Sequence, residues 1–517
     1  MAAGAGSGRL DCPGHSFPVS LPQSEAMPNA TAPRSSGHDA TKNSAVAESG
    51  GVYHGVLDMI GRTPILELAK MFAKGPGNPA GCRVFAKMEM MNPAGSIKDR
   101  IGLSMIEAAE KAGTLDPKGV PAPTIVEATA GNTGLGLALV AGQKGYRLKV
   151  VVPDKMSQEK IQHLRAMGAE VILARSDVQK GHPEYYQEVA AKIASQTPNS
   201  LYVNQFGNPD NSRAHYDTTG PEIWEQMQGK VDVFVTGVGS GGTLSGCGKF
   251  FREKKPDMQI VLADPAGSML HPLVNEGKHV TATSWLVEGM GEDFVPDICD
   301  IELCNSAVAV TDGEAFIAAR ELLRLEGVLA GSSTGCLLHA VKVFVAKQSK
   351  PLNVVTFCCD TGSKYLSKMF NDFWMIDNGF IQRERKNDLS DLVARRHQDR
   401  EDYTLEDTDS VKIAIKRMGM YGVSQMVVMD PRDKICGIID EGDILLAVTH
   451  DPTAFDKPVS DFMTRRLETI KPTASVNDLM PIFRADRVAI VVDEKGQYHG
   501  LITKFDLISY LRAKLVR

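Results

Sequence analysis

The stretch RVFAKMEMMNPAGSIKDR, residues 83–100, holds the strand-to-helix connection around which the rest of the chain is organised. Its apolar run Val84–Ala86 predicts a strand, and the NPAG further along cannot continue one. Ser96 and Asp99 are spaced like a capping box, so we expect a helix to open there. Lys98 then lies in the first turn, where the macrodipole lowers the pKa of its amine. A lysine whose neutral form is favoured suits Schiff-base chemistry, although such a stretch alone more often marks an ordinary solvated lysine.

The composition indicates a soluble protein of two or three domains, because 517 residues are too many for a single core. Apolar residues make up 43% and charged residues 23%, as in ordinary globular proteins. The net charge of −6 offers no basic face to nucleic acid, and no apolar run is long enough to span a membrane. The nine cysteines include no CxxC pair, so we expect no disulfide framework and no metal site. A reducing compartment, the cytoplasm, fits this pattern.

Residues 1–50 are rich in Ala, Gly, Ser, Pro and Asn and have almost no apolar periodicity, so we predict a disordered tail. They lack the apolar stretch of a signal peptide, and Arg9 and Arg34 give only thin support for a transit peptide. Cys12 and His15 could ligate a metal or a haem. Two such residues without supporting neighbours are, however, more typical of an inert segment.

From about residue 51 to residue 380, apolar runs of strand length alternate with amphipathic helical patterns. The predicted strands include 124–126, 148–152, 171–173, 231–235, 260–262 and 354–357. The predicted helices between them include 135–144 and 159–167. This alternation predicts an α/β fold with parallel sheets, in which ligands bind beyond the carboxyl ends of the strands.

Two of the predicted strand-to-helix turns combine glycine with hydroxyl or amide side chains. The first, EATAGNTG at 127–134, offers backbone N–H groups and hydroxyls to a carboxylate, and Asn132 can hydrogen-bond a ring hydroxyl. A capped tight turn would have the same sequence. The other, AGSSTG at 330–335, places Ser333 where a neutral hydroxyl can meet a heterocyclic nitrogen, or where it simply caps a helix.

A third turn, GVGSGGT at 237–243, predicts a phosphate cradle of backbone amides with two hydroxyls. It also matches G-x-G-x-x-G, and Asp264 ends a strand about 20 residues later, as in dinucleotide-binding folds. This match is the main support for a different function, that of an NAD-dependent oxidoreductase. A Walker A loop is excluded, because Gly248-Lys249 lacks the upstream glycine and the following Ser or Thr.

The C-terminal part contains an internal repeat. Residues 381–403 are rich in charge and predict a solvated linker with some helix. Beyond them, segments 426–439 and 489–502 each predict a β-hairpin followed by a helix that starts with an acid. These acids are Asp443 and, 63 residues later, Asp506. A repeated hairpin and helix predict two half-modules packed into one domain.

These motifs together resemble the fold-type II pyridoxal-phosphate β-replacement enzymes of the cysteine synthase/cystathionine β-synthase family. The likeness rests on NPAGSIKDR at 92–100, GNTG at 131–134, GSGGT at 239–243 and Ser333, which match in type and order. Residues 404–517 resemble a tandem CBS-domain (Bateman) module. The resemblance covers everything except the N-terminal tail.

The composition indicates a tail at 1–50 and a charged linker at 381–403. The resemblance implies a catalytic domain of two parallel-sheet α/β subdomains at 51–380 and a regulatory Bateman module of two CBS motifs at 404–517. It also implies an enzyme, acting as a homodimer, that condenses L-serine with L-homocysteine to L-cystathionine and water. Hydrogen sulfide made from cysteine would be a further product.

For the site, the resemblance implies that Lys98 holds pyridoxal 5′-phosphate covalently and then moves the proton at the substrate α-carbon. The other cofactor-binding residues would be Asn132 at the ring hydroxyl, Ser333 at the pyridine nitrogen, and Gly239, Ser240, Gly241, Gly242 and Thr243 at the phosphate. A serine at that nitrogen leaves it unprotonated, which favours β-elimination and replacement over transamination. The implied substrate-binding residues are Thr129, Ala130, Thr133, Gln205, Gly289 and Gly291.

Three residues depart from the family pattern: Ala130 replaces a common Ser, Phe206 a Tyr, and Glu292 a Tyr beside the expected second-substrate site. They keep open the alternative of a cysteine synthase that uses O-acetylserine and sulfide. Comparing homocysteine with sulfide as the acceptor separates the two enzymes. Nothing in the sequence matches the widely spaced Cys and His of the haem-bearing animal enzymes, so we expect no haem.

The C-terminal module resembles modules that bind adenosyl ligands through an acid that bridges the ribose. The implied ligand site consists of Gln425, Asp443, Thr503 and Asp506. Ser424 and Val427 stand where the S-adenosylmethionine-responsive enzymes have Asp and Pro. We therefore expect weak or no S-adenosylmethionine binding and largely constitutive activity. A non-catalytic adenosyl sensor is a further alternative, which the intact Lys98 disfavours.

Overall fold

The computed structural model describes residues 52–515 apart from 130, 155, 157, 179–180 and 384–385. The predicted tail, with Cys12 and His15, lies outside the described residues. Among the helices that are described, none combines the length and the apolar character needed to cross a membrane.

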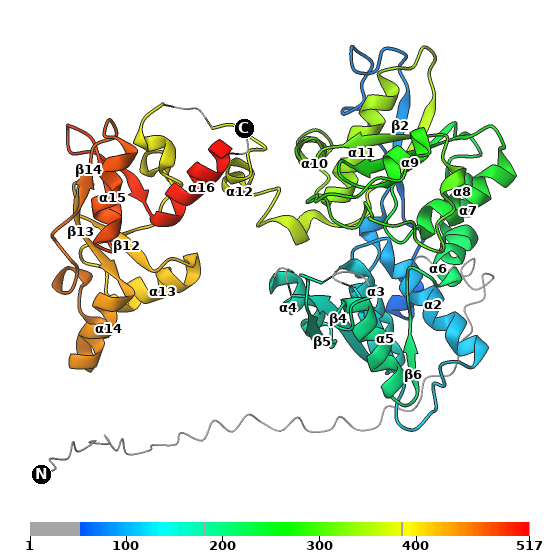
Figure 1. The fold of residues 1–517 in the computed structure, drawn as a ribbon, viewed down its shortest axis with the longest axis horizontal. Coiled ribbons are helices and arrows are strands. Elements are labelled where there is room, and N and C mark those ends of the chain that lie inside the picture. The colour runs from blue at the N-terminus through cyan, green and yellow to red at the C-terminus, as the bar shows by residue number, and fades with distance from the viewer. Residues whose placement is uncertain are drawn as a thin grey trace, which may run out of the picture. The chain divides into compact units, whose positions relative to one another are not determined.

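The larger sheet has six strands in the order β1-β2-β10-β7-β8-β9. Its strand β2 is labelled in Figure 1. Its strands are β1 (Ile65–Glu67), β2 (Arg83–Lys87), β10 (Asn353–Phe357), β7 (Val233–Thr236), β8 (Gln259–Pro265) and β9 (Ser306–Val310). All neighbours are parallel except β1, which runs antiparallel to β2. The central strands β7 and β10 are almost wholly buried, which explains why they are continuous apolar runs in the sequence.

The helices around this sheet contribute buried side chains to its apolar core. They are α7 (Gly220–Gln226), α8 (Gly242–Lys254), α9 (Leu270–Glu276), α10 (Asp312–Glu326), α11 (Ser332–Val345) and α12 (Asp372–Asp377). Three buried aromatic rings join α8 to the middle of the sheet. Phe234 of β7 meets Phe251 of α8 and Phe357 of β10 edge-on, with ring centroids 5.0 and 5.7 Å apart. The strands that carry the loops described below are therefore anchored in one rigid core.

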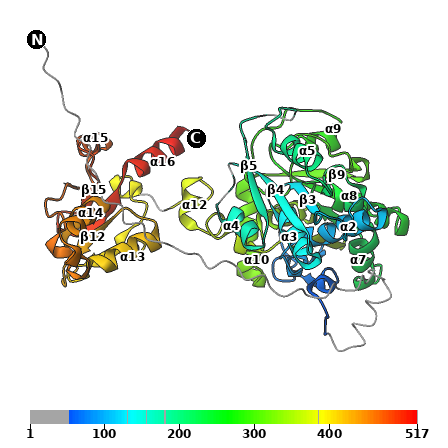
Figure 2. The same cartoon turned by 90° about the horizontal axis from the view of Figure 1, so that it is seen from below.

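The smaller sheet has four parallel strands in the order β5-β4-β3-β6. They are β5 (Glu170–Ala174), β4 (Arg147–Pro153), β3 (Thr124–Ala128) and β6 (Ser200–Tyr202). The helices α3 (Asn132–Lys144), α4 (Gln158–Ala166) and α5 (Tyr186–Gln196) pack around it (Figure 2). The two predicted parallel-sheet subdomains are thus confirmed, and the predicted strands and helices match these elements to within a few residues.

In the smaller subdomain α2 (Lys98–Ala112) packs against α3, and a glycine makes this contact possible. A Cβ atom on Gly136 of α3 would lie 2.7 Å from the carbonyl oxygen of Lys98 and 3.1 Å from the Cα atom of Asp99. Both neighbours are backbone atoms, so the two helices can approach this closely only without a side chain at this position. Lys98 and Asn132, the first residues of the two helices, are placed beside each other as a result.

The predicted start of α2 is correct, but the predicted capping box is wrong. The N-cap residue is Ile97, and no side chain caps the helix in the usual way. The Ser96 hydroxyl oxygen accepts a hydrogen bond from the Lys98 N–H at 3.2 Å. The Asp99 carboxylate does not return to the Ser96 N–H; it accepts from the Ala94 N–H at 2.6 Å. Asp99 therefore stabilises the turn that leads to Lys98 rather than the helix end itself.

The C-terminal module contains two small sheets of the same design, β11-β12-β13 and β14-β15-β16. Their strands are β11 (Thr404–Glu406), β12 (Gln425–Met429), β13 (Ile435–Asp440), β14 (Thr469–Ile470), β15 (Ala489–Val492) and β16 (Tyr498–Ile502). Its helices are α13 (Val411–Tyr421), α14 (Glu441–His450), α15 (Val476–Arg484) and α16 (Lys504–Leu515). Each hairpin has a register shift at the equivalent place, between Val428 and Met429 and between Val491 and Val492. The predicted repeat of 63 residues is confirmed down to this irregularity.

Part of the predicted solvated linker is packed. Leu389, Leu392 and Val393 are buried in the apolar cluster of the second repeat. A Cβ atom on Gly500 of β16 would lie 2.3 Å from Cγ1 of Val393, so the linker runs directly over this strand. The charged residues around them led to the prediction of exposure for the whole of 381–403, although these three apolar residues lie among them.

Candidate active site

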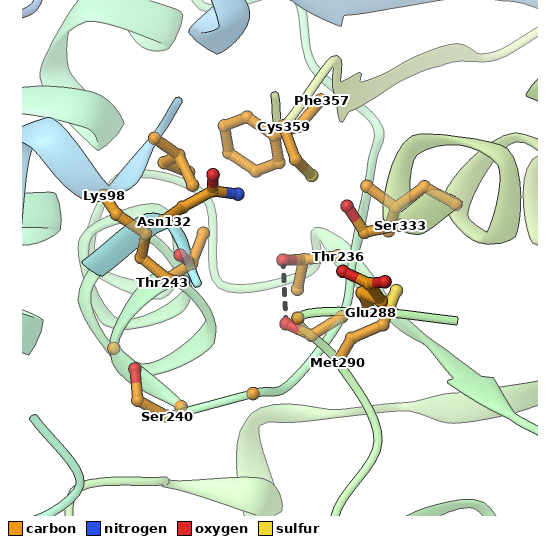
Figure 3. Close-up of a pocket in the computed structure, with 17 residues that line it drawn as sticks. Lys98, Asn132, Thr236, Ser240, Thr243, Glu288, Met290, Ser333, Phe357 and Cys359 are labelled. Atoms are coloured by element: carbon orange, nitrogen blue, oxygen red, sulfur yellow. Dashed lines mark hydrogen bonds between the residues drawn. The ribbon is translucent and has the colours of Figure 1, made fainter. Parts of the chain in front are cut away.

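The residues predicted to bind a cofactor line one cavity at the carboxyl end of the larger sheet (Figure 3). Lys98 and Asn132 lie on one side of this cavity, and Ser333 lies on the opposite side. The glycine-rich loop 237–243, with Ser240, forms a further wall. Gly239, Gly241, Gly242 and Thr243 all belong to the lining. The strand order explains why these residues meet, because the neighbouring strands β2, β10 and β7 all end at this cavity. The turn before α3 lies at the same cavity.

The Lys98 amine is buried at the start of α2, and burial lowers its pKa because a charged amine is poorly solvated there. The negative charges of Asp360 and Glu292 oppose this shift. The predicted direction is therefore confirmed, but its main cause is burial rather than the helix dipole. An amine held in its neutral form can attack an aldehyde, which is the requirement for covalent attachment of a cofactor.

The loop 237–243 connects β7 to the N-terminus of α8 and depends on its glycines. Gly241 has a φ of +87°, in the left-handed region. A Cβ atom on Gly239 would lie 2.6 Å from the backbone oxygen of Gly289. A helix N-terminus with the hydroxyls of Ser240 and Thr243 beside it supplies N–H and O–H donors, and this donor set fits a phosphate group.

Buried side chains hold the two hydroxyls of this loop. The Asn211 amide donates to the Ser240 oxygen at 2.9 Å. The Thr243 hydroxyl lies 3.3 Å from Nε2 of His215, which is fully buried. Burial lowers the pKa of His215 to about 3, so its ring is neutral at physiological pH. The loop is thus supported by uncharged groups that do not compete with a bound anion.

Ser333 lies in the first turn of α11 and faces the cavity. The helix-cap alternative for this residue is wrong, because the N-cap position is occupied by Gly331. The Cys359 thiol, which also lines the cavity, is hydrogen-bonded to Ser333. Burial raises the pKa of Cys359 to about 12, so the sulfur keeps its proton. Both groups next to a heterocyclic nitrogen would therefore be neutral.

Asn132 is held by a network that the sequence did not reveal. The Lys364 amine donates to its Oδ1 at 2.6 Å. Its own Nδ2 donates to Asp360 Oδ2 at 2.9 Å, and the Tyr365 hydroxyl donates to the same oxygen at 2.9 Å. All three partners belong to the loop after β10, residues 358–365. Its strand was predicted, but its role required the strand order, which places β10 between the strands leading to Lys98 and to the loop 237–243.

The predicted substrate-binding residues of the first turn lie together. The Thr133 hydroxyl donates to Gln205 Oε1 at 2.7 Å, and the Thr129 oxygen accepts from the Gly131 N–H at 3.3 Å. Ala130 lies outside the described residues. Glu127 is buried below this turn and accepts from the Gln205 N–H at 3.4 Å.

Of the two predicted glycines downstream, Gly289 lines the cavity, whereas Gly291 is not part of the lining. Instead, the Gly291 N–H donates to the Val238 oxygen at 2.8 Å and ties this segment to the glycine-rich loop. Glu288 next to Gly289 also lines the cavity and was missed by sequence reasoning. Its carboxylate pairs with Lys160 of α4 and with Lys368, at 2.9 Å in the second case.

The dinucleotide alternative loses its acidic residue. Asp264 is fully buried, and its carboxylate accepts from the His271 N–H at 2.7 Å at the start of α9. It does not line the cavity. The side chain that seemed to match a ribose-binding acid therefore stabilises a neighbouring helix.

In the C-terminal module, the predicted adenosyl-ligand residues are only partly brought together. Gln425, Thr503 and Asp506 line one cavity, whereas Asp443 does not. Asp443 forms a capping box with Asp440 at the start of α14. The Asp506 carboxylate accepts from the Thr503 hydroxyl at 2.6 Å.

Comparisons with known proteins agree with this geometry. Residues 56–360 match the family described as "Pyridoxal-phosphate dependent enzyme", and residues 397–450 and 459–513 match "CBS domain". A cystathionine beta-synthase of Dictyostelium discoideum is 34% identical over 475 residues, which cover 88% of this chain and 92% of that protein. An O-acetylserine dependent cystathionine beta-synthase of Bacillus subtilis is 40% identical over 315 residues, or 60% of this chain and 96% of that protein. A hydrogen sulfide-producing enzyme of Fusobacterium nucleatum matches with a TM-score of 0.55 and 36% identity, over 61% of this chain and all of that structure.

Proposed function

Since this chain belongs to the cystathionine β-synthase family of pyridoxal-phosphate-dependent enzymes, we propose that it joins L-serine to L-homocysteine through Lys98 and the cavity around it. The chain is a β-replacement enzyme of transsulfuration. In the proposed reaction the bond between Cβ and the hydroxyl oxygen of serine breaks, and the bond between Cβ and the homocysteine sulfur forms. The leaving hydroxide takes up the thiol proton, so the products are L-cystathionine and one water.

The observation that carries this proposal is the convergence of four cofactor-binding groups on one cavity. The Lys98 amine would attach the cofactor, and the loop 237–243 would hold its phosphate. Asn132 would bond its ring hydroxyl, and Ser333 would meet its pyridine nitrogen. When bound, pyridoxal phosphate withdraws electrons from the substrate α-carbon. A neutral hydroxyl at the nitrogen keeps this withdrawal moderate, which favours replacement at Cβ.

The chain's own groups supply the remaining steps. The Lys98 amine, released when substrate takes its place, accepts the α-proton and later returns it. The turn with Thr129 and Thr133, together with Gln205, would bind the substrate carboxylate. The Thr133–Gln205 hydrogen bond orients both side chains before substrate arrives, so less entropy is lost on binding.

The test is the product formed from each pair of substrates, identified by mass spectrometry. We expect serine with homocysteine to give cystathionine, and Lys98→Ala to lower turnover on the order of 1000-fold. The matched control is Lys111→Ala, an exposed lysine near the other end of α2, which should retain full activity. The absorption of the lysine-bound cofactor should change on adding L-serine. Retention of turnover by Lys98→Ala would contradict the role of this lysine.

One residue favours the alternative substrates O-acetylserine and sulfide. Glu292 carries a negative charge close enough to act on Lys98, and the family pattern has a tyrosine there. A relative that depends on O-acetylserine and another that produces hydrogen sulfide lie among the similar proteins. If O-acetylserine with sulfide is the faster pair, the chain is a cysteine synthase with a CBS module, and the lysine assignment stands unchanged.

The proposed organisation keeps the predicted boundaries: a tail at 1–50, a catalytic domain at 51–380, a linker at 381–403 and a Bateman module at 404–517. We also propose a homodimer, as is usual in the family. The described cysteines are all free thiols, which supports a reducing compartment such as the cytoplasm.

For the module, we propose that S-adenosylmethionine binds weakly or not at all. Two features support this: Asp443 forms a capping box at the start of α14 and does not line the cavity of the other three residues, and Asp506 is already bonded to Thr503. When S-adenosylmethionine is added at micromolar levels, turnover should stay within about twofold of its value without the ligand. A several-fold rise would overturn the proposal, and calorimetry would then locate the binding.

A further inference from the structure

The loop after β10 surrounds the amide of Asn132 with groups of fixed hydrogen-bonding character. Lys364 can only donate, and it reaches Oδ1 at 2.6 Å. Asp360 Oδ2 accepts from Nδ2 at 2.9 Å and also from the Tyr365 hydroxyl at 2.9 Å. A flipped amide would place its nitrogen against the lysine and its oxygen against the carboxylate. The orientation of Asn132 is therefore decided by its partners rather than left to chance.

One N–H of Asn132 remains after these bonds are counted. Nδ2 carries two hydrogens, and Asp360 takes one of them. Asn132 lines the cavity, and Figure 3 shows its amide nitrogen on the cavity side. The ring hydroxyl of the cofactor, which is an acceptor when ionised, would meet this second N–H. An oxygen in the same position would repel it.

Contacts with the surrounding chain hold Lys364 in the position from which it donates to Asn132. Its side chain is partly buried, and its amine also lies 3.4 Å from the Ala94 oxygen, in the turn that leads to Lys98. The Thr361 N–H donates to the Gly95 oxygen at 3.1 Å, so the loop is bonded to the same turn by its backbone. Asp360 provides the compensating charge that a buried ammonium requires.

We propose that Lys364 is a positioning residue which, with Asp360, locks the Asn132 amide so that it presents an N–H to the ring hydroxyl of the cofactor. Lys364 itself does not touch the cofactor in this role. The inference rests on the cofactor contact proposed above for Asn132 and extends it to the residues that make the contact possible.

The experiment is a double-mutant cycle that combines Lys364→Met with Asn132→Ala. Two quantities are measured: the dissociation constant of pyridoxal phosphate from the cofactor-free protein, and the absorption spectrum of the loaded enzyme. Lys364→Met should weaken cofactor binding about tenfold and change the spectrum, because the Oδ1 of Asn132 loses its donor and the amide is free to turn. Lys364→Arg, which can also only donate, should restore most of the affinity.

The cycle separates positioning from a general structural role. In the Asn132→Ala background, Lys364→Met should cause no further loss. The control is Lys342→Met, which removes another partly buried lysine whose partner is Glu321, and which should leave affinity and spectrum unchanged. Thermal unfolding of the cofactor-free variants identifies any that fail to fold. If Lys364→Met fails to fold, the cofactor affinity of Lys364→Arg tests the positioning role instead.

Three outcomes would overturn the inference. An equal loss from Lys364→Met in both backgrounds would show that it acts without Asn132. An unchanged affinity in Lys364→Met, with a clear loss in Asn132→Ala, would remove the positioning role and leave the cofactor contact intact. No effect of Asn132→Ala would remove the contact and the inference together, while the Lys98 assay would still report on the proposed function.

Discussion

The loop 237–243 and the loop 358–365 reach the same cavity from adjacent strands, β7 and β10, but they are built in different ways. The first is shaped by missing side chains, because glycines allow its backbone to contact the segment around Gly289. The second is shaped by the side chains of Asp360, Lys364 and Tyr365, which converge on Asn132 or on one another. A loop made by backbone contact should tolerate no added atom, whereas a loop made by side chains should tolerate replacements that keep the hydrogen-bonding character.

The largest effect is expected in the glycine-built loop. Gly239→Ala would place a methyl group 2.6 Å from the backbone oxygen of Gly289, which cannot move without shifting its own segment. Overpacking of this kind costs about 1–3 kcal/mol, so cofactor affinity should fall by up to about 100-fold. Equilibrium dialysis against pyridoxal phosphate measures this. Gly142→Ala in α3, where an added Cβ atom meets nothing within 4 Å, serves as the control and should bind normally.

An intermediate effect is expected for Glu127, whose side chain accepts from the backbone N–H of Gln205. It should be visible only in the pH dependence of stability. Burial raises the pKa of Glu127 from 4.5 to about 8, so the folded protein binds a proton that the unfolded chain has released. Its contribution to stability is complete below pH 4.5 and is lost as the pH rises to about 8, by at most about 1.4 kcal/mol per pH unit.

Glu127→Gln should therefore flatten the fall in Tm of the cofactor-free protein between pH 5 and pH 8, on the order of a few degrees per unit. Glu170→Gln, at an exposed position, is the control and should follow the parent protein. Parallel curves for all three proteins would mean that Glu127 is ionised in the folded state.

The smallest effect is expected in the loop built by side chains. Tyr365→Phe removes one donor to Asp360 Oδ2 but leaves the Asn132 and Lys364 contacts in place. A single hydrogen bond is worth about 0.5–1.5 kcal/mol, so cofactor affinity should fall only two- to tenfold, as an order-of-magnitude range. If Tyr365→Phe weakens binding as much as Gly239→Ala does, the proposed difference between the two loops is wrong.

This contrast also explains what the sequence could predict. The glycines of the loop 237–243 and the helix-start pattern at Lys98 are local features, and local features are visible in a sequence. The same holds for the apolar strands, since buried parallel strands are continuous apolar runs. The internal repeat was equally visible, because both copies carry the same hairpin and the same acid.

The network around Asn132 was not predictable in this way. Lys364 lies 232 residues after Asn132, and nothing in its neighbourhood distinguishes it from a solvated lysine. Only the strand order, with β10 between β2 and β7, brings it to the cavity. The capping box failed for a related reason, because Asp99 found a better partner in Ala94 than the local pattern indicated. Asp264 misled through coincidental spacing.

The contact between α2 and α3 at Gly136 has a mechanical consequence. Because no side chain separates the two backbones there, the helices that carry the amine of Lys98 and the amide of Asn132 form one rigid unit. Ser333 and the loop 237–243 belong to the opposite wall of the cavity, which is part of the larger-sheet subdomain. A substrate that draws the walls together would change the width of the cavity while the spacing of Lys98 and Asn132 stayed constant. The reacting lysine and the group that reads the cofactor ring would thus keep their alignment throughout such a movement.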